Sequence, residues 1–431
     1  MVTYTDVTCP FCGCLCDDIE ITVENNKITN AKNSCAISRS KFLNNNLNRI
    51  TESSISGKPV QYEEAIDEAA NILANAKRPL IYGLSKTDNE AVRNAVYLSE
   101  LIGGVIDNTT SVCHGSSILA LQHVGASTTT LGEVKNRANL IIFWGSNPAE
   151  AHPRHMTRYS VTPKGKYITN GRKDRYVVVV DVRETLSGKA ANQFIRIEPN
   201  SDFEILQSLR AIIRGEKLHL REIGGVPIEV LESLADRMKG AKVGCIFYGL
   251  GLNQSEGRHM NIEAMYSLVS ELNHHTKFVV DPMRGCYNVT GSNMVSTWQT
   301  GYPFAVDMSR GYPRYNPGEY TGVDILARRE ADAALIMGSD PASTFPVDAV
   351  KYLAKIPIVT LERKPTPTSM LSRVVIPVAV SGVESEGTAY RMDIVPIKMR
   401  KVIDPPRGIL PDVRVLEDII KRVKPLKEVR L

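Results

Sequence analysis

The fold is decided by the stretch Leu140-Ile141-Ile142-Phe143-Trp144-Gly145-Ser146-Asn147-Pro148, in which an apolar run of strand length ends at a glycine and a proline. A near copy stands later in the chain, at Ala333–Gly338 followed by Ser339-Asp340-Pro341. Continuous apolar runs separated by helical patterns indicate parallel strands that are covered on both faces. The two copies predict two related sheets or two similar halves of a ligand. The alternative is that Gly-x-x-Pro only ends a strand and starts a helix.

The same alternation continues along the chain from about Pro59. We expect further strands at Pro79–Gly83, Tyr176–Asp181, Val243–Gly249, Lys277–Asp281 and Ile358–Leu361, and helices at Glu90–Ile102, Asp202–Ile213, Ile228–Met238 and Asn261–Leu272. The sequence therefore predicts an α/β fold with two doubly wound, Rossmann-like parallel-sheet domains. Their ligands are expected at the carboxyl ends of the strands, where Gly249-Leu250-Gly251 also lies. The aperiodic segment 298–320, which is rich in Gly, Pro and Tyr, predicts an ordered functional loop.

The composition excludes several classes of protein. The chain has 431 residues, 43% of them hydrophobic, with 52 Lys and Arg against 47 Asp and Glu. This balance excludes a disordered or fibrous chain. No apolar run approaches the roughly 18 residues of a membrane span, and the first residues do not resemble a secretory signal. We therefore expect a cytoplasmic protein that binds neither membrane nor nucleic acid, although the net charge of +5 suits small anions or a phosphorylated cofactor.

Cysteines are concentrated at one end of the chain. Five of the eight lie in the first 35 residues, at Cys9, Cys12, Cys14, Cys16 and Cys35. This crowding favours metal binding in a reducing compartment over a disulfide framework. Four thiolates can enclose zinc or hold a [4Fe–4S] cluster. The spacing lacks a second C-x2-C pair and favours the cluster, while zinc and plain core cysteines remain alternatives.

Three further patterns could support chemistry. Cys113-His114 precedes Gly-Ser-Ser, where helix N–H groups would lower a thiol pKa and favour a nucleophile or metal ligand. Arg284 follows a strand and could bind a carboxylate through two hydrogen bonds. Asp181, near Arg183, ends a strand where an acid often binds a ribose or purine. The respective alternatives are an inert buried cysteine, a surface ion pair and a helix N-cap.

Taken in order, these motifs resemble one family. The series is C-x2-C-x3-C, V-C-H-G-S-S, G-S-N-P-A-E-A-H-P, V-V-D-V-R-x-T, P-N-S-D, G-L-G, P-M-R-G-C, G-S-D-P and E-S-E-G-T. It resembles the molybdopterin oxidoreductases of the dimethyl sulfoxide reductase superfamily, from Cys9 to about Arg391. Within that superfamily, the opening Cys9–Glu20 and the segment Cys35–Phe42 are most similar to the B subunits of formylmethanofuran dehydrogenases.

The resemblance implies a [4Fe–4S] cluster near tungsten or molybdenum, with the metal held by two molybdopterin guanine dinucleotides. It implies that Cys9, Cys12, Cys16 and Cys35 bind the cluster. It further implies that Cys113 binds the metal, with His114 and Arg284 beside it. The dinucleotides would be bound by Gly145, Ser146, Asn147, Pro148, Asp181, Arg183, Asp202, Gly249 and Gly251, and by Gly338, Ser339, Asp340 and Pro341.

The implied domain organisation has four parts. Residues 1–55 form an iron–sulfur head, residues 56–110 with 315–405 form one dinucleotide-binding domain, and residues 111–314 form the second. Residues 406–431 form a tail. The C-terminal β-barrel of most superfamily members is missing, so we expect a small β-barrel partner chain to complete the cofactor site. An amidohydrolase-type metallosubunit and ferredoxin-like polyferredoxin subunits are the other implied partners.

The implied activity is reversible reduction of CO2 to formate, for N-formylation of methanofuran by a partner subunit. One departure concerns electron transfer, since Ile37 replaces the lysine of related formate dehydrogenases, and Arg39 or Lys41 could substitute. Three alternative interpretations remain. The chain could be a stand-alone enzyme resembling formate dehydrogenase, or a cofactor-free scaffold subunit of a formyltransferase complex. It could also be a nucleotide-binding fold with a zinc-binding head.

Overall fold

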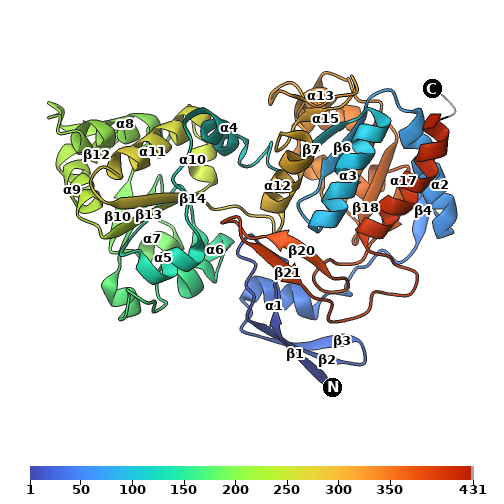
Figure 1. Cartoon of the computed structure of the whole chain (residues 1–431), viewed down its shortest axis with the longest axis horizontal. Helices are drawn as coiled ribbons and strands as arrows, with labels where there is room; N and C mark the ends of the chain where they lie inside the picture. The colour runs from blue at the N-terminus through green and yellow to red at the C-terminus, as the bar shows by residue number, and fades with distance from the viewer. Residues whose placement is uncertain (429–431) are drawn as a thin grey trace. The chain divides into compact units, whose positions relative to one another are not determined.

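The computed structural model describes residues 1–428 and divides the chain into two compact units (Figure 1). Unit 1 comprises Met1–Ser111, Cys286–Arg391 and Pro396–Leu431, and unit 2 comprises Val112–Gly285 and Met392–Val395. Each unit has its own hydrophobic core around a sheet that is parallel at its centre. Within residues 1–428, no helix combines the length and the apolar character that a bilayer crossing requires.

Unit 2 is built on five parallel strands in the spatial order β10-β9-β8-β13-β14. They are β8 (Leu140–Trp144), β9 (Tyr176–Asp181), β10 (Gln193–Arg196), β13 (Val243–Tyr248) and β14 (Lys277–Pro282). Helices α8, α9 and α11 lie over one face and α5, α6 and α7 over the other (Figure 1). This double cover buries every residue of β8 and explains its continuous apolar sequence. The helical segments are α4 (Gly115–Val124), α5 (Leu131–Arg137), α6 (Pro148–Ala151), α7 (Leu186–Lys189), α8 (Asp202–Ile213), α9 (Ile228–Lys239), α10 (Leu250–Gln254), α11 (His259–Leu272), a π-helical turn (Met156–Ser160) and a 3-10 turn (Gly171–Asp174), with a small ribbon of β11 (Glu222–Ile223) and β12 (Val226–Pro227).

Unit 1 contains a nine-stranded mixed sheet in the order β16-β15-β7-β6-β17-β18-β19-β4-β5. Its strands are β4 (Ser53–Ile55), β5 (Lys58–Val60), β6 (Pro79–Gly83), β7 (Val105–Asn108), β15 (Val306–Asp307), β16 (Arg314–Tyr315), β17 (Ala333–Met337), β18 (Ile358–Glu362) and β19 (Val374–Pro377). The N-terminal segment adds a three-stranded antiparallel sheet and a helix, and a hairpin lies near the C-terminus. These are β1 (Val2–Val7), β2 (Ile19–Glu24), β3 (Lys27–Lys32), α1 (Ala36–Leu43), β20 (Gly387–Tyr390) and β21 (Pro396–Met399).

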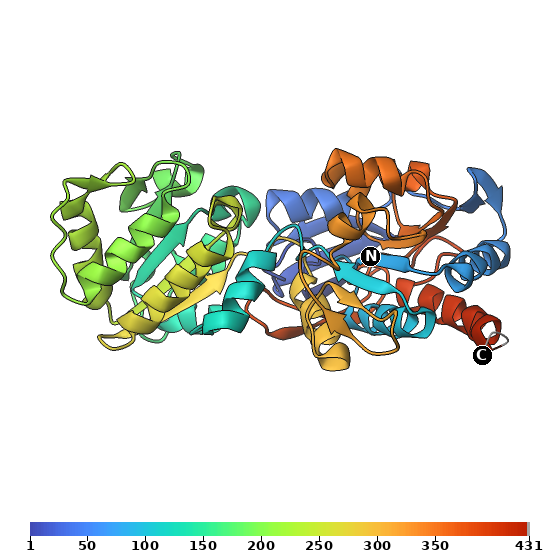
Figure 2. The same ribbon diagram turned by 90° about the horizontal axis from the view of Figure 1, so that it is seen from above.

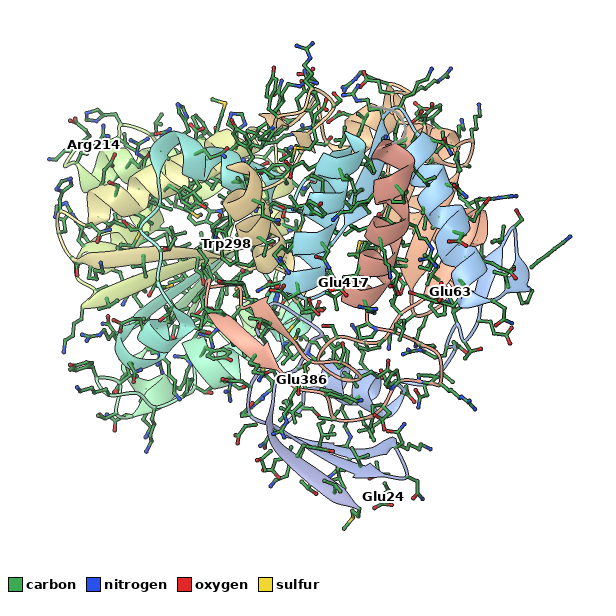
Figure 3. All side chains as sticks on the ribbon, turned by 45° about the vertical axis from the view of Figure 1, so that its right-hand side comes forward. Glu24, Glu63, Arg214, Trp298, Glu386 and Glu417 are labelled. Atoms are coloured by element: carbon green, nitrogen blue, oxygen red, sulfur yellow. The ribbon has the colours of Figure 1, made fainter. Side chains whose placement is uncertain are left out.

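Helices α2, α3 and α17 pack together on one side of the unit 1 sheet, where they appear in blue and red (Figures 1 and 2). Val415, Leu416 and Ile419 of α17 are fully buried in this layer. At its edge, Arg422 Nη2 pairs with Glu63 Oε2 of α2 at 2.9 Å (Glu63 is labelled in Figure 3). The helices of unit 1 are α2 (Tyr62–Asn75), α3 (Asn89–Ile102), α12 (Val289–Thr300), α13 (Gly322–Ala327), α14 (Pro341–Thr344), α15 (Val347–Leu353), α16 (Pro367–Leu371) and α17 (Asp412–Glu428).

The parallel cores of the two units share one spatial order. Read across the sheets, β10-β9-β8-β13-β14 of unit 2 corresponds to β19-β18-β17-β6-β7 of unit 1. The chain enters them differently, since unit 2 begins with the central strand β8 whereas unit 1 begins with β6 and β7. The two cores are therefore circular permutations of one arrangement, and the two copies of Gly-Ser-x-Pro follow equivalent central strands.

The predicted parallel-sheet α/β fold is confirmed. Every strand and helix that the apolar patterns predicted matches an element of the structure within two residues at either end. The predicted aperiodic segment 298–320 is wrong at its start, since residues 298–300 form the end of α12 (Val289–Thr300), whereas residues 301–320 contain only the two-residue strands β15 and β16.

Candidate functional site

Close contacts between glycines hold the loop after β8 against the segment that follows β13. Gly145 has a φ of +53°, and a Cβ there would lie 2.6 Å from the backbone nitrogen of Leu252. The Gly251 N–H donates to the Gly145 carbonyl at 2.9 Å, and the Gly249 N–H donates to the Trp144 carbonyl at 3.1 Å. The structure therefore brings the predicted residues Gly145, Gly249 and Gly251 together at the carboxyl edge of the unit 2 sheet.

Asn147 ties this loop to the segment after β9. Its Oδ1 accepts a hydrogen bond from the Ser187 hydroxyl at 2.7 Å, and the hydroxyl oxygen accepts from the Ala149 N–H at 3.0 Å. Ser187 lies on α7, shortly after Asp181 at the end of β9. Sequence analysis identified Asn147 and Asp181 but not Ser187, because nothing in the local pattern around a serine reveals a partner on the neighbouring strand.

The loop after β17 in unit 1 is built in the same way. Between Gly338 and Pro341, Asp340 Oδ1 accepts from the Thr368 hydroxyl at 2.6 Å. The Ala342 N–H donates to that hydroxyl oxygen at 3.0 Å. The aspartate and threonine therefore take the places that an asparagine and a serine hold in unit 2. The repeated sequence motif thus corresponds to a repeated hydrogen-bond network.

An acidic residue ends the neighbouring strand in each unit. In unit 2 this residue is Asp181, and in unit 1 it is Glu362. Each directly follows the residue whose carbonyl accepts from the loop glycine N–H, at 2.9 Å in unit 2 and 3.1 Å in unit 1. Burial raises the pKa of both carboxyl groups. Sequence analysis missed Glu362, since its equivalence to Asp181 depends on the pairing of β17 with β18.

Asp202 begins α8 and contacts the core of unit 2. Its Oδ1 accepts from the Trp144 indole N–H at 2.7 Å. Burial raises the pKa of Asp202, and the negative charge of Asp181 raises it further. The two predicted acids therefore lie within electrostatic reach of each other. Arg183 is exposed, and its backbone N–H contacts Asp181 Oδ1 at 3.5 Å.

Basic side chains gather around the unit 1 loop. Burial, and then the positive charges of Lys86 and Arg363, lower the pKa of Lys41. Burial and the charges of Arg363 and Lys41 likewise lower the pKa of Lys364. Lys86 lies against the loop, since a Cβ on Gly338 would be 3.0 Å from its Cβ. Four cations within reach of one another favour a site for an anionic group.

A buried polar network surrounds His114 at the start of α4. His114 is only 2% exposed, and its Nδ1 lies 3.1 Å from both Ser117 Oγ and Asn253 Nδ2. Its Nε2 has no hydrogen-bond partner among the residues that the structure describes. Burial, followed by the positive charge of Arg284, lowers the pKa of His114 to about 3. The imidazole is therefore neutral.

Arg284 lies two residues after the end of β14 and is 5% exposed. Burial lowers the pKa of its guanidinium, while Tyr248 and Cys113 act in the opposite direction. The His152 Nε2–H donates to the Arg284 carbonyl at 2.9 Å and fixes the loop that carries the side chain. Since Arg284 influences His114 and is influenced by Cys113, the three predicted residues come together in unit 2. Sequence analysis gave His152 no role, although the motif G-S-N-P-A-E-A-H-P contains it.

The N-terminal cysteines form a second cluster, in unit 1. The Cys9 N–H donates to the Cys16 carbonyl at 2.8 Å, and Cys35 is the N-cap of α1. Burial raises the pKa of Cys9, and the nearby Cys12, Cys16 and Cys35 raise it further. The extra thiol of Cys14 hydrogen-bonds Cys12 and lowers its pKa to about 7. Three of the four predicted cluster ligands therefore lie within electrostatic reach of the fourth, Cys9.

The arrangement of these thiols fits an iron–sulfur cluster. In residues 1–428, no three His, Cys, Asp or Glu side chains converge closely enough to hold a single metal ion. A [4Fe–4S] cluster has a different requirement, because each thiolate binds its own iron at a separate corner. A loop with three cysteines and a fourth at a helix start can meet that requirement.

Comparison with known protein families identifies the class to which the chain belongs. A model of the family "Molybdopterin oxidoreductase" matches residues 57–422, which is most of the chain. The chain therefore belongs to the molybdopterin oxidoreductase family.

Two relatives narrow the class. The chain is 50% identical to the B subunit of the tungsten-containing formylmethanofuran dehydrogenase 2 of Methanocaldococcus jannaschii, over 97% of this chain and 98% of the relative. It is 45% identical to the protein of the same name from Methanococcus maripaludis, over 99% of this chain and 100% of the relative. The resemblance to the B subunits of formylmethanofuran dehydrogenases is thus confirmed, and the chain is an enzyme of that class.

A solved structure supports the fold. The formyltransferase/hydrolase complex FhcABCD from Methylorubrum extorquens contains a chain that superposes with a TM-score of 0.72. The match covers 88% of this chain and 99% of that chain, with 21% sequence identity. At this identity the likeness concerns the fold alone.

Proposed function

We propose that this chain is the redox subunit of a formylmethanofuran dehydrogenase and reversibly converts CO2 to formate. In the reductive direction, CO2 takes up two electrons and one proton. The observation that carries the proposal is the convergence of the partly buried Cys113 with the buried side chains of His114 and Arg284 in unit 2. A partner subunit would then transfer the formyl group to methanofuran.

Tungsten or molybdenum, held by two molybdopterin guanine dinucleotides, would supply the two-electron chemistry when bound. The Cys113 thiolate would bind the metal, since a soft thiolate suits it. In unit 2, residues 145–148 and 249–251 with Asp181, Arg183 and Asp202 would hold one dinucleotide. In unit 1, residues 338–341 with Glu362 would hold the other, and the cations around that loop suit its phosphate groups.

Arg284 and His114 would handle the substrate. The guanidinium of Arg284 is able to donate two parallel hydrogen bonds to a carboxylate and so stabilise charge that develops on its oxygens. His114 would orient the substrate or carry its proton through Nε2, which has no protein partner among the described residues. Burial of both side chains strengthens these interactions, because little water competes.

Cys9, Cys12, Cys16 and Cys35 would bind a [4Fe–4S] cluster that delivers electrons one at a time. Of the two basic residues that could replace the missing relay lysine, the structure favours Lys41. Its ammonium acts on the pKa of Cys12 and lies 5.4 Å from the ring of Phe11. A β-barrel subunit, an amidohydrolase-type metallosubunit and polyferredoxin subunits would complete the complex.

The test is formate-dependent dye reduction by the anaerobically purified complex. Arg284→Lys should keep its metal and iron but lose about 100-fold in kcat, because an ammonium cannot form the two-pronged contact. Arg196→Lys, at an exposed position of the same unit, should behave as wild type. Wild-type turnover in Arg284→Lys would contradict the role of Arg284. A wild-type complex without metal and without formate turnover would favour the scaffold alternative.

A further inference from the structure

Asn253 lies at the centre of the polar network around His114. It belongs to α10 and is 1% exposed. Its Nδ2 donates to the Gly249 carbonyl at 3.0 Å, and its Oδ1 accepts from the Ser117 hydroxyl at 2.8 Å. Because a backbone carbonyl only accepts, the Gly249 contact fixes which side of the carboxamide is the NH2 group. The second N–H of that group faces His114 Nδ1 at 3.1 Å.

A count of hydrogens then assigns the imidazole tautomer. The single hydrogen of Ser117 is used on Asn253 Oδ1, so it is not available to His114. A proton on Nδ1 would place two N–H donors face to face at 3.1 Å and leave the Asn253 donor unpaired. A lone pair on Nδ1 instead accepts from Asn253, so that the Ser117 hydroxyl and both N–H groups of Asn253 are paired. The hydrogen-bond pattern therefore assigns the proton to Nε2.

The Nε2–H is then a buried donor without a protein acceptor. His114 is 2% exposed, and Nε2 has no hydrogen-bond partner among the described residues. A hydrogen-bonding interaction with the Met283 backbone raises the pKa of the ring, although no contact of Nε2 meets the ordinary distance and angle of a hydrogen bond. An unsatisfied buried donor is unfavourable unless a ligand supplies an acceptor. Arg284, whose charge acts on the same ring, also offers only donors. A buried N–H donor within electrostatic reach of a guanidinium suits the oxygen atoms of a carboxylate or of CO2.

We propose that Asn253 is a positioning residue that holds the His114 ring with a lone pair on Nδ1 and its proton on Nε2. In this state His114 donates a hydrogen bond to a substrate oxygen and does not remove a proton from the substrate. The identity of the substrate rests on the proposed function, whereas the tautomer rests on the network alone. The inference also decides between the two roles left open for His114.

The direct test is solid-state 15N NMR of the assembled complex labelled with [15N]histidine. A difference spectrum against His114→Gln isolates the His114 signals. In the wild type, we expect Nδ1 unprotonated and Nε2 protonated. In Asn253→Asp, whose carboxylate accepts only, Nδ1 should become protonated. The control is Asn261→Asp, a buried asparagine on α11 that donates to the Glu256 carbonyl and makes no contact with His114, and it should leave the His114 signals unchanged.

Measurements of kcat test whether His114 donates a hydrogen bond to the substrate. The amide nitrogen of a glutamine reaches about the place of Nε2, whereas that of an asparagine reaches only the place of Nδ1. His114→Gln should therefore lose about tenfold in kcat for formate, and His114→Asn about 100-fold or more.

Three results would overturn the proposal: a proton on Nδ1 in the wild type, an unchanged ring in Asn253→Asp, or equal losses in the glutamine and asparagine variants. If Asn253→Asp fails to assemble, the wild-type spectrum still decides. A complex without formate turnover would contradict the proposed function. The NMR spectrum would still show which nitrogen of His114 carries the proton.

Discussion

Units 1 and 2 carry the same loop on equivalent strands, but they surround it with different chemistry. In both, a polar residue after Gly-Ser accepts from a hydroxyl group, and an acid ends the neighbouring strand. Unit 1 adds a group of cations, Lys41, Lys86, Arg363 and Lys364. Unit 2 instead places the neutral network of His114 beside Arg284.

This difference between the units distinguishes residues that could bind a cofactor from residues that could act on a substrate. A loop that occurs twice with the same hydrogen bonds suits one class of ligand bound twice. Among residues 1–428, the three that we propose to act at the substrate lie in unit 2, whereas unit 1 contains the N-terminal cysteines and the cations. On the proposed function, unit 1 binds phosphates and receives electrons, and unit 2 provides the substrate site.

The largest effect is expected at the buried ion pair of unit 1. Arg49 Nη2 and Glu384 Oε2 lie 2.9 Å apart, and their side chains are 3% and 0% exposed. Arg49→Met should lower the free energy of unfolding by about 3–5 kcal/mol, because the buried carboxylate of Glu384 loses its cationic partner. Chemical denaturation measures this, and Arg49→Met combined with Glu384→Met should recover part of the loss. If the denaturation midpoint of Arg49→Met equals that of the wild type, the buried ion pair does not stabilise unit 1.

The cations of unit 1 should govern cofactor retention. Lys86→Met removes the charge beside Gly338 and should reduce dinucleotide affinity about tenfold, which corresponds to one charge-assisted hydrogen bond. The nucleotide released from the denatured complex measures retention, with Lys421→Met at an exposed position of α17 as the control. If Lys86→Met retains as much nucleotide as the wild type, the proposal that these cations bind the phosphate groups of a dinucleotide is wrong.

A smaller effect concerns pH. Burial, and then the charge of Asp88, raise the pKa of Asp412 to about 7. The folded state therefore binds a proton more tightly than the unfolded state, so stability falls as pH rises from about 4 to about 7. Asp412→Asn should reduce the difference in Tm between pH 5 and pH 8 by a few degrees. A wild-type Tm that does not change between these pH values would contradict this.

The smallest effects test the equivalence of the two loops. Ser187→Ala in unit 2 and Thr368→Val in unit 1 each remove the hydroxyl that ties the loop to the next strand. Each should cost about 1 kcal/mol of stability by denaturant unfolding. A cost confined to one of the two variants would mean that the loops are not equivalent.

The sequence predicted what local patterns encode. Apolar runs such as Leu140–Trp144 located the strands, and Gly-Ser-x-Pro located both loops at their carboxyl ends. The strands of the N-terminal sheet were missed, because β2 and β3 mix polar with apolar residues and lack a continuous apolar run.

The hydrogen-bond partners of the candidate site residues could not be predicted from the sequence either. Asn253 reaches His114 across 139 residues, and His152 reaches Arg284 across 132. Only strand order brings such pairs together, and no local periodicity encodes strand order. Cys113, His114 and Arg284 were proposed from motifs, and their roles as ligands and catalysts stay predictions.

The central claim is that the Cys113 thiolate binds a tungsten or molybdenum atom. The most direct measurement is elemental analysis of the anaerobically purified complex containing Cys113→Ala, beside Cys245→Ala, which changes a fully buried core cysteine of β13. The account predicts that Cys113→Ala loses the heavy metal and formate turnover while its iron remains, and that Cys245→Ala keeps all three. Wild-type metal content together with formate oxidation in Cys113→Ala would contradict it.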